Sequence, residues 1–252
     1  MFGRRSAIED MAGQAARSAA RFLRTADALG DAGLRSPSGL ATWTRGHVLA
    51  HVARSADAYV WLLRLARTGT EPGPRADAAA MARAVEEGAA LPAAELPADT
   101  RRSLDRFAGE VGTMPGPAWD TMVTALAGWR HPAWYVLCRC VRELETHHVD
   151  LAAGYRTADW PEAYVAWALE ETLAALAARG FPLSRVTAAD HGRTWEVSPE
   201  GPAVTAPGHV LLGWLSGRTP AARVIGDGEP GILPVPPPWP QPPVPGWGPA
   251  AG

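Results

Sequence analysis

Apolar residues recur every three to four positions through most of the first 180 residues. Residues at this spacing share one face of an α-helix, so the pattern predicts amphipathic helices packed around a common core. We predict helices over residues 8–29, 44–69, 77–88, 99–111, 133–154 and 160–180. In the second of these, Thr44 is placed as the N-cap and Gly69 as the stop. Its predicted buried stripe is Val48, Val52, Ala56, Tyr59 and Leu63.

The pattern changes after Gly180. Short β-branched segments, "SRVTAAD", "RTWEVS" and "PAVTA", are bounded by Gly, Pro or Asp and predict strands, with one helix over about 207–216. The chain then becomes proline-rich, "PVPPPWPQPPVPGWGPAAG", which predicts an extended tail. We therefore expect a mainly α protein with a helical bundle over residues 1–180, a small α+β domain over 181–233 and a tail over 234–252.

Composition excludes several classes of function. The 26 acidic residues slightly outnumber the 24 basic ones, so the positive excess needed for binding nucleic acid is missing. All the basic residues are arginine, and the absence of lysine excludes Schiff-base catalysis. We expect no membrane span, because no apolar run approaches about 20 residues. With no signal peptide and only Cys138 and Cys140, read as buried thiols, we expect a cytoplasmic protein.

Two pairs of metal-ligating residues stand at helical spacing. His47 and His51 are four residues apart, and so are Glu143 and His147, so each pair projects from one helix face. Zinc accepts imidazole and carboxylate ligands, and three of them leave one position open for chemistry. We omit His47 as the residue nearest the start of its helix, where the bundle should open to solvent. Asp150 could orient a ligand imidazole.

Structural explanations remain open for these residues. The histidine spacing could be coincidence, and Glu143 could instead pair with Arg139 on a solvated helix face. We expect His131 and His209 to be structural and His191 to mark a turn between strands.

Four segments together carry a resemblance to a known family. They are "WTRGHVLAHVARSADA" (43–58), "LETHHVDLAAGY" (144–155), "ADWPEAYV" (158–165) and "LLGWLSGR" (211–218). The sequence resembles the mycothiol-dependent maleylpyruvate isomerase family, whose bundle is DinB-like, over most of its length. The resemblance implies a DinB-like four-helix bundle followed by a small C-terminal domain.

The resemblance also implies a site. Zinc would be held by His51, Glu143 and His147, and an arginine of the C-terminal domain would bind the thiol cofactor, mycothiol. Arg218 best matches that arginine, with Arg193 and Arg223 as the other candidates. From the chemistry of the reaction, we also expect Arg218 to be catalytic, because positive groups such as Arg218 or Arg54 would stabilise an enolate oxygen and substrate carboxylates. We take Arg54 as a second cofactor-binding candidate.

The reaction implied is cis–trans isomerisation of maleylpyruvate to fumarylpyruvate. Addition of a zinc-activated thiolate would make the double bond single and free to rotate, and elimination would return the thiol. The expected partners are therefore a small-molecule thiol and an electrophilic small molecule. Two alternatives remain: a mycothiol S-transferase, or a non-catalytic metal-binding module. Departures from the family pattern at Ser55 and in "VLCRCVRE" put the substrate in doubt.

Overall fold

The structure is a computed structural model that describes residues 2–226 and 233–240. Its contacts divide the chain into two compact units, residues 1–155 and 156–252, and each unit is described by itself.

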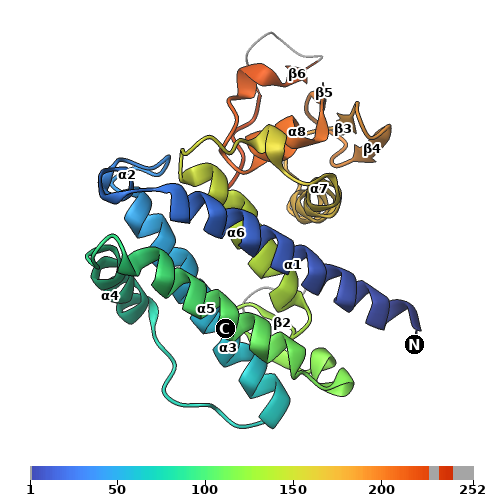
Figure 1. Cartoon of the computed structure of the whole chain (residues 1–252). Helices are drawn as coiled ribbons and strands as arrows, with labels where there is room; N and C mark the ends of the chain where they lie inside the picture. Colours follow the sequence, from blue (N-terminus) through green and yellow to red (C-terminus); the bar gives the residue numbers. More distant parts are fainter. Residues whose placement is uncertain (1, 227–232, 241–252) are drawn as a thin grey trace. The chain divides into compact units, whose positions relative to one another are not determined.

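The first unit is helical (Figure 1). Four of its helices are long: α1 (Phe2–Ala28), α3 (Arg45–Thr68), α5 (Glu95–Gly112) and α6 (Tyr135–Asp150). They pack in a closed cycle in which α1 contacts α6, α6 contacts α3, α3 contacts α5 and α5 contacts α1. This cycle is a four-helix bundle, as predicted. Two shorter helices, α2 (Asp31–Arg35) and α4 (Ala78–Ala89), and an antiparallel hairpin of β1 (Met122–Thr124) and β2 (Arg130–Pro132) complete the unit.

Local sequence signals fix the ends of α3. Thr44 is its N-cap, and Gly69 ends it in the left-handed conformation with φ 71°, which glycine adopts without steric cost. The predicted stripe of apolar residues along this helix is buried in the core. Both predicted ends of α3 are therefore confirmed.

The second unit contains α7 (Glu162–Ala177), α8 (Gly208–Leu215) and a four-stranded sheet. The strands are β3 (Arg185–Ala188), β4 (Arg193–Glu196), β5 (Ala203–Ala206) and β6 (Ile225–Gly226), in the order β4-β3-β5-β6. β3 pairs parallel with β5, and the other pairings are antiparallel. The predicted strands and the predicted helix over 207–216 are all present.

The structure differs from the predicted organisation in the start of α5 and in the unit to which α7 belongs. α5 begins at Glu95 rather than near residue 99, because Pro97 falls in the first turn, where its missing N–H has no helical acceptor. α7 packs against α8 within the second unit, so the contacts divide the chain before α7, whereas the pattern placed it in the bundle. The boundary at residue 180 stays a prediction.

The proline-rich tail is described only up to residue 240, and its predicted extended conformation over 241–252 lies outside the described residues. Within the described part, the Trp239 indole N–H lies 3.4 Å from Thr172 Oγ1 of α7, so this segment folds back onto its own unit.

None of the described helices is both long enough and apolar enough to span a bilayer.

Helix α4 approaches α3 closely at Gly88. A Cβ built at Gly88 would lie 2.9 Å from the Cβ of Ala50, closer than two carbon atoms can pack. Gly109, in α5, has no neighbouring atom within 4 Å of the same built position. The two helical glycines therefore differ in what a side chain would meet.

We predict opposite effects for the same substitution at these two glycines. Gly88→Ala should lower the free energy of unfolding by about 1–2 kcal/mol, because α4 must move away from α3. Gly109→Ala should raise it by about 0.5–1 kcal/mol through better helix propensity. Urea unfolding followed by circular dichroism checks both values. Stabilisation of the Gly88 variant would show that α4 does not pack as described.

Candidate metal centre

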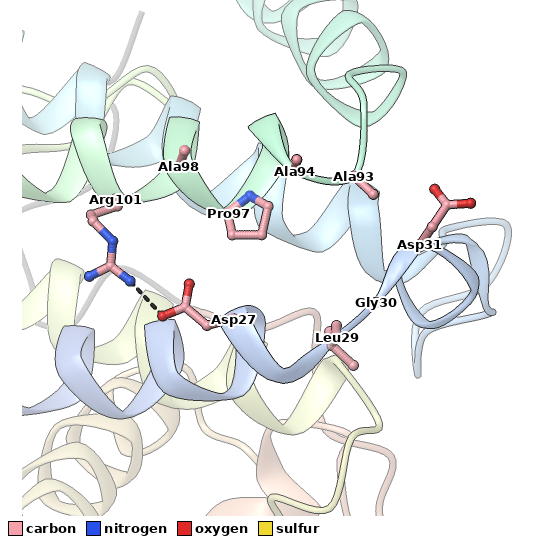
Figure 2. A pocket seen from close by; sticks show the side chains of 9 residues that line it. All are labelled: Asp27, Leu29, Gly30, Asp31, Ala93, Ala94, Pro97, Ala98 and Arg101. Atoms are coloured by element: carbon pink, nitrogen blue, oxygen red, sulfur yellow. Dashed lines mark hydrogen bonds and ion pairs between the residues drawn. The ribbon is translucent and has the colours of Figure 1, made fainter.

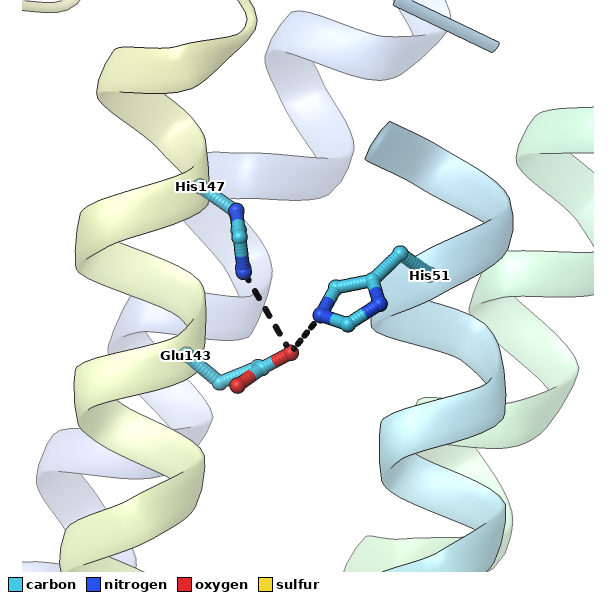
Figure 3. A group of neighbouring side chains, drawn as sticks. All are labelled: His51, Glu143 and His147. Carbon is cyan, nitrogen blue, oxygen red and sulfur yellow. Dashed lines mark ion pairs between the residues drawn. The ribbon is translucent and has the colours of Figure 1, made fainter. Parts of the chain in front are cut away.

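Three potential metal ligands converge between α3 and α6 (Figure 3). His51 projects from α3, and Glu143 and His147 project from successive turns of α6. Their ligand atoms all lie within 4.8 Å of one another. His51 Nε2 is 2.7 Å and His147 Nε2 is 3.5 Å from the same atom, Glu143 Oε1. Residues 92 positions apart in sequence thus meet at one point, as the spacing argument required.

The donor set suits a tetrahedral ion. Ligands about 2.0–2.1 Å from zinc stand roughly 3.3–3.4 Å apart at tetrahedral angles, which falls between the two nitrogen–oxygen distances above. Two imidazoles and one carboxylate are also the donor set of a catalytic zinc site with one open position. The side chains of His51, Glu143 and His147 are 30%, 19% and 14% exposed, so a small molecule can reach them. Among the described residues, no other group of three such side chains comes this close together.

Asp150 holds the ring of His147. Its Oδ2 lies 2.9 Å from His147 Nδ1, and the carboxylate is 4% exposed. Donation of the Nδ1 proton to Asp150 leaves the Nε2 lone pair directed toward Glu143 and any ion between them. The expected contact between Asp150 and the His147 imidazole is present, and its role in orienting a metal ligand stays a prediction.

Two residues of α3 hold Glu143 from the other side. The Ser55 hydroxyl donates to Glu143 Oε1 at 2.7 Å, and the Tyr59 hydroxyl lies 3.5 Å from Oε2. Burial raises the pKa of the Glu143 carboxyl, but the adjacent His51 and His147 and the hydrogen bonds from His51 and Ser55 lower it further, to well below its usual range. Glu143 is therefore ionised, as a metal ligand must be.

The pKa of His51 shifts in the opposite direction to that of Glu143. Burial lowers the pKa of its imidazole, but Glu143 and, more weakly, Asp150 outweigh this effect and leave the pKa raised. Without an ion, the carboxylate favours a protonated His51. A metal entering the site must displace that proton.

His47 is not part of the cluster, because its ring contacts Thr44 and Glu86 instead. Its position near the start of α3 did not predict these contacts. The Thr44 backbone N–H donates to His47 Nδ1 at 3.2 Å, and the Thr44 hydroxyl lies 2.7 Å from the same nitrogen. His47 Nε2 faces Glu86 of α4 at 3.3 Å. The ring thus completes a capping box at the start of α3.

The opposite face of α6 binds α1. Glu145, 1% exposed, accepts hydrogen bonds from Ser18 and Arg21 of α1 and from Tyr155. His148 stacks on the Tyr155 ring at 3.7 Å between centroids. The motif Glu-x-Glu-x-His-His is thus divided between two faces, one for the candidate metal centre and one for helix packing.

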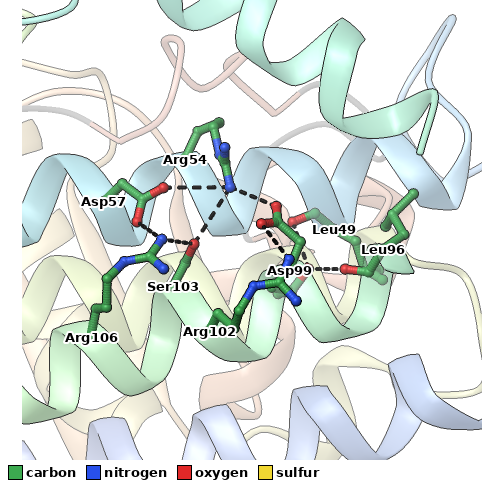
Figure 4. A network of polar contacts seen from close by, with 9 residues as sticks. Leu49, Arg54, Asp57, Leu96, Asp99, Arg102, Ser103 and Arg106 are labelled. Atoms are coloured by element: carbon green, nitrogen blue, oxygen red, sulfur yellow. Dashed lines mark hydrogen bonds and ion pairs between the residues drawn. The ribbon is translucent and has the colours of Figure 1, made fainter. Parts of the chain in front are cut away.

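Arg54 has competing partners in the structure (Figure 4). Its guanidinium pairs with Asp99 of α5 at 2.6 Å and with Asp57 at 3.4 Å, within a polar network that joins α3 to α5. A ligand would have to displace these carboxylates, so the predicted binding role of Arg54 stays a prediction that the geometry weakens.

The candidate arginines of the second unit differ in their surroundings. Arg218 donates to the Ser216 carbonyl at 2.5 Å, and its guanidinium carbon lies 5.9 Å from the centre of the Trp239 ring. Arg193 pairs with Glu170, and Arg223 is exposed in the described structure. Arg193 is therefore the least available of the three.

Other predicted structural residues lie as expected. His131 is fully buried, and burial lowers the pKa of its imidazole to about 4. Cys138 and Cys140 are buried and unbridged, and burial raises the pKa of the Cys138 thiol to about 11. His191 lies in the turn between β3 and β4. The alternative pairing of Glu143 with Arg139 is wrong, because in the described chain Glu143 pairs with the two histidines instead.

Two cavities lie away from the cluster. One of about 420 Å³ separates the end of α1 from the start of α5 and is walled mainly by Leu, Ala, Pro and Gly, with an Asp27–Arg101 ion pair of 2.6 Å at one side (Figure 2). The other, of about 300 Å³, lies in the second unit beside His191 and His209. Neither contains a residue of the His–Glu–His cluster.

Known proteins share the first domain of this chain and its overall fold. The family model for the mycothiol maleylpyruvate isomerase N-terminal domain matches residues 15–152, more than half of the 252-residue chain. A crystal structure of a mycothiol-dependent maleylpyruvate isomerase is similar with a TM-score of 0.83 at 24% identity, and covers 92% of this chain and 97% of that one. A histidine-to-alanine variant of an enzyme of that name has a TM-score of 0.82 at 23% identity, with the same coverage. No curated protein matches the chain.

Fold and site together define a four-helix bundle protein with a candidate three-ligand metal centre and a small α+β C-terminal unit. The chain belongs to the mycothiol maleylpyruvate isomerase family. The two crystal structures show that it shares the fold of their chains over nearly its whole length.

We predict that substitution of His51 or His147 abolishes zinc binding, whereas substitution of His47 does not. His51→Ala, Glu143→Ala and His147→Ala should each lose stoichiometric zinc, because two ligands cannot hold the ion. His47→Ala should keep the zinc and lose about 1 kcal/mol of stability through its cap. Elemental analysis of purified proteins measures the zinc, and thermal unfolding measures the stability. Equal zinc loss in the His47 variant would overturn this ligand set.

Asp150→Asn should weaken zinc binding without abolishing it. The amide retains a hydrogen-bond acceptor but not the charge that makes His147 a better ligand, so we expect a loss of about 10-fold in affinity. Competition with a chromophoric chelator gives the affinity. An unchanged affinity would reduce Asp150 to a packing residue.

Proposed function

We propose that this protein is a zinc-dependent, mycothiol-using cis–trans isomerase that acts on maleylpyruvate or a close analogue. The observation that carries the proposal is the convergence of His51, Glu143 and His147 on one point within the family's own domain. The names of the family and of the two similar structures supply the thiol and the substrate. The partners are thus a small-molecule thiol and an electrophilic small molecule.

The residues present fit a divalent ion. His51, Glu143 and His147 would hold it, and Asp150 and Ser55 would fix the two ligands that they contact. When bound, zinc supplies a positive charge that lowers the pKa of a thiol at the open position. The two proposed ligands on α6 are held in place before substrate arrives, because Asp150 contacts His147 and Ser55 donates a hydrogen bond to Glu143.

Arg218 is the residue that we propose for binding the thiol cofactor. Its guanidinium is held at its position by the Ser216 carbonyl and the Trp239 ring. A guanidinium is planar and always charged, which suits it to binding an oxygen-rich ligand.

The proposed activity is tested by combining purified zinc-loaded protein with mycothiol and maleylpyruvate and following the loss of the enol absorbance. Turnover that requires both zinc and mycothiol is expected. Adduct formation with a model electrophile, without isomerisation, would show a mycothiol S-transferase instead. Inactivity in both assays would show a non-catalytic member of the family.

We predict that Arg218→Ala weakens mycothiol binding and leaves zinc in place. Loss of a charged hydrogen-bond donor should raise the dissociation constant about 10-fold or more. Titration calorimetry with mycothiol gives the constant, and elemental analysis gives the zinc content. Arg223→Ala, an exposed arginine of the same unit, is the matched control and should bind as the wild type does. A loss only in the control variant would move the role to Arg223.

A further inference from the structure

A third pair of side chains continues the contact between α3 and α6. The first pair is His51 and His147, with ring centroids 4.7 Å apart, and the second is Ser55 and Glu143. One turn further along both helices, the guanidinium carbon of Arg139 lies 4.9 Å from the centre of the Tyr59 ring. Arg139 is four residues before Glu143, so it lies about 6 Å along α6 from the carboxylate ligand. A positive charge therefore stands one helical turn from the candidate metal centre.

Neutral groups surround Arg139. Besides Tyr59, its guanidinium carbon lies 5.9 Å from the centre of the Trp129 ring, and NH1 lies 3.2 Å from His131 Nε2. His131 is uncharged near neutral pH, because burial lowers the pKa of its imidazole to about 4. Over residues 2–226 and 233–240, no carboxylate comes within ion-pair distance of Arg139. The aromatic faces hold the guanidinium plane and leave donors at its edge.

A second arginine, Arg75, lies close enough to Arg139 to be affected by its charge. Partial burial and the positive charge of Arg139 lower the pKa of the Arg75 guanidinium, and Glu71 offsets only part of this effect. The guanidinium carbon of Arg75 lies 5.2 Å from the centre of the Trp61 ring, and in the described chain Arg75 too has no ion pair with a carboxylate. By contrast, Arg64, Arg67 and Arg106 on the neighbouring helices are all paired with acids. Two neighbouring guanidinium groups that form no direct ion pair are stabilised by an anionic ligand.

We propose that Arg139, assisted by Arg75, binds a carboxylate of the substrate. The inference rests on the proposed function and deepens it: the electrophile is a dicarboxylate with one end at the metal centre and a carboxylate about one helical turn away. Arg139 offers the planar pair of donors that a carboxylate accepts, and Arg75 adds long-range attraction. An electrophile lacking the second carboxylate would lose this contact.

The test uses zinc-loaded protein with maleate and its monomethyl ester as probes, and measures each dissociation constant by titration calorimetry. Wild-type protein should bind maleate more tightly than the ester. Arg139→Gln should lose about 10-fold or more in maleate affinity, change little for the ester and keep its zinc. Arg75→Gln should show a smaller loss in the same direction. Arg130→Gln, which removes an exposed charge from the nearby hairpin, should bind both probes as the wild type does.

Three outcomes contradict the proposal: unchanged maleate affinity in Arg139→Gln, an equal loss for both probes, or an equal effect of Arg130→Gln. If Arg139→Gln fails to fold, Arg75→Gln decides, and an unchanged preference for maleate in that variant overturns the inference. Probe binding needs neither mycothiol nor turnover. A protein that binds maleate through Arg139 but does not convert maleylpyruvate would therefore refute the proposed function alone.

Discussion

The partly buried carboxylate of Glu143 makes the contacts on which the organisation of this bundle depends. A carboxylate removed from water is costly unless donors surround it. Here the partners come from both helices: His51, Ser55 and Tyr59 on α3 contact the carboxylate, and the His147 ring on α6 lies 3.5 Å from it. This arrangement requires α3 and α6 to run antiparallel and to keep their register to within a fraction of a turn. A slip of one turn would leave the charge without partners.

Contacts outside the cluster also fix the register of α3 against α6. The capping box of Thr44 and His47 fixes where α3 begins, and Asp150 fixes the last turn of α6. Glu145 and His148 bind α1 and Tyr155 on the other side of α6, which sets the rotation of that helix. The ligands therefore gain their alignment from helix packing, so little rearrangement is needed for an ion to bind, and catalytic groups benefit from such preorganisation.

Much of this could be predicted from local sequence, because the helices and the ligands follow short-range rules. The stripe on α3, the caps Thr44 and Gly69, and the spacing of Glu143 and His147 are all properties of fewer than 30 consecutive residues. The partners of Arg54 could not be predicted, since Asp99 lies 45 residues away and meets it only through the packing of α3 on α5. Spacing left open a pairing of Arg139 with Glu143, whereas aromatic rings from other elements contact the Arg139 guanidinium. Strands of three residues, such as β1, carry too little periodicity to be recognised.

The two adjacent histidines of α6 constrain how this gene can change. His147 faces the candidate metal centre and His148 faces α1, because consecutive helical residues point about 100° apart. Insertion or deletion of a single codon between Glu143 and His147 would keep every amino acid type nearby and yet turn the second ligand out of the cluster. The stretch from Glu143 to His147 can therefore change by substitution between the ligands, but not in length.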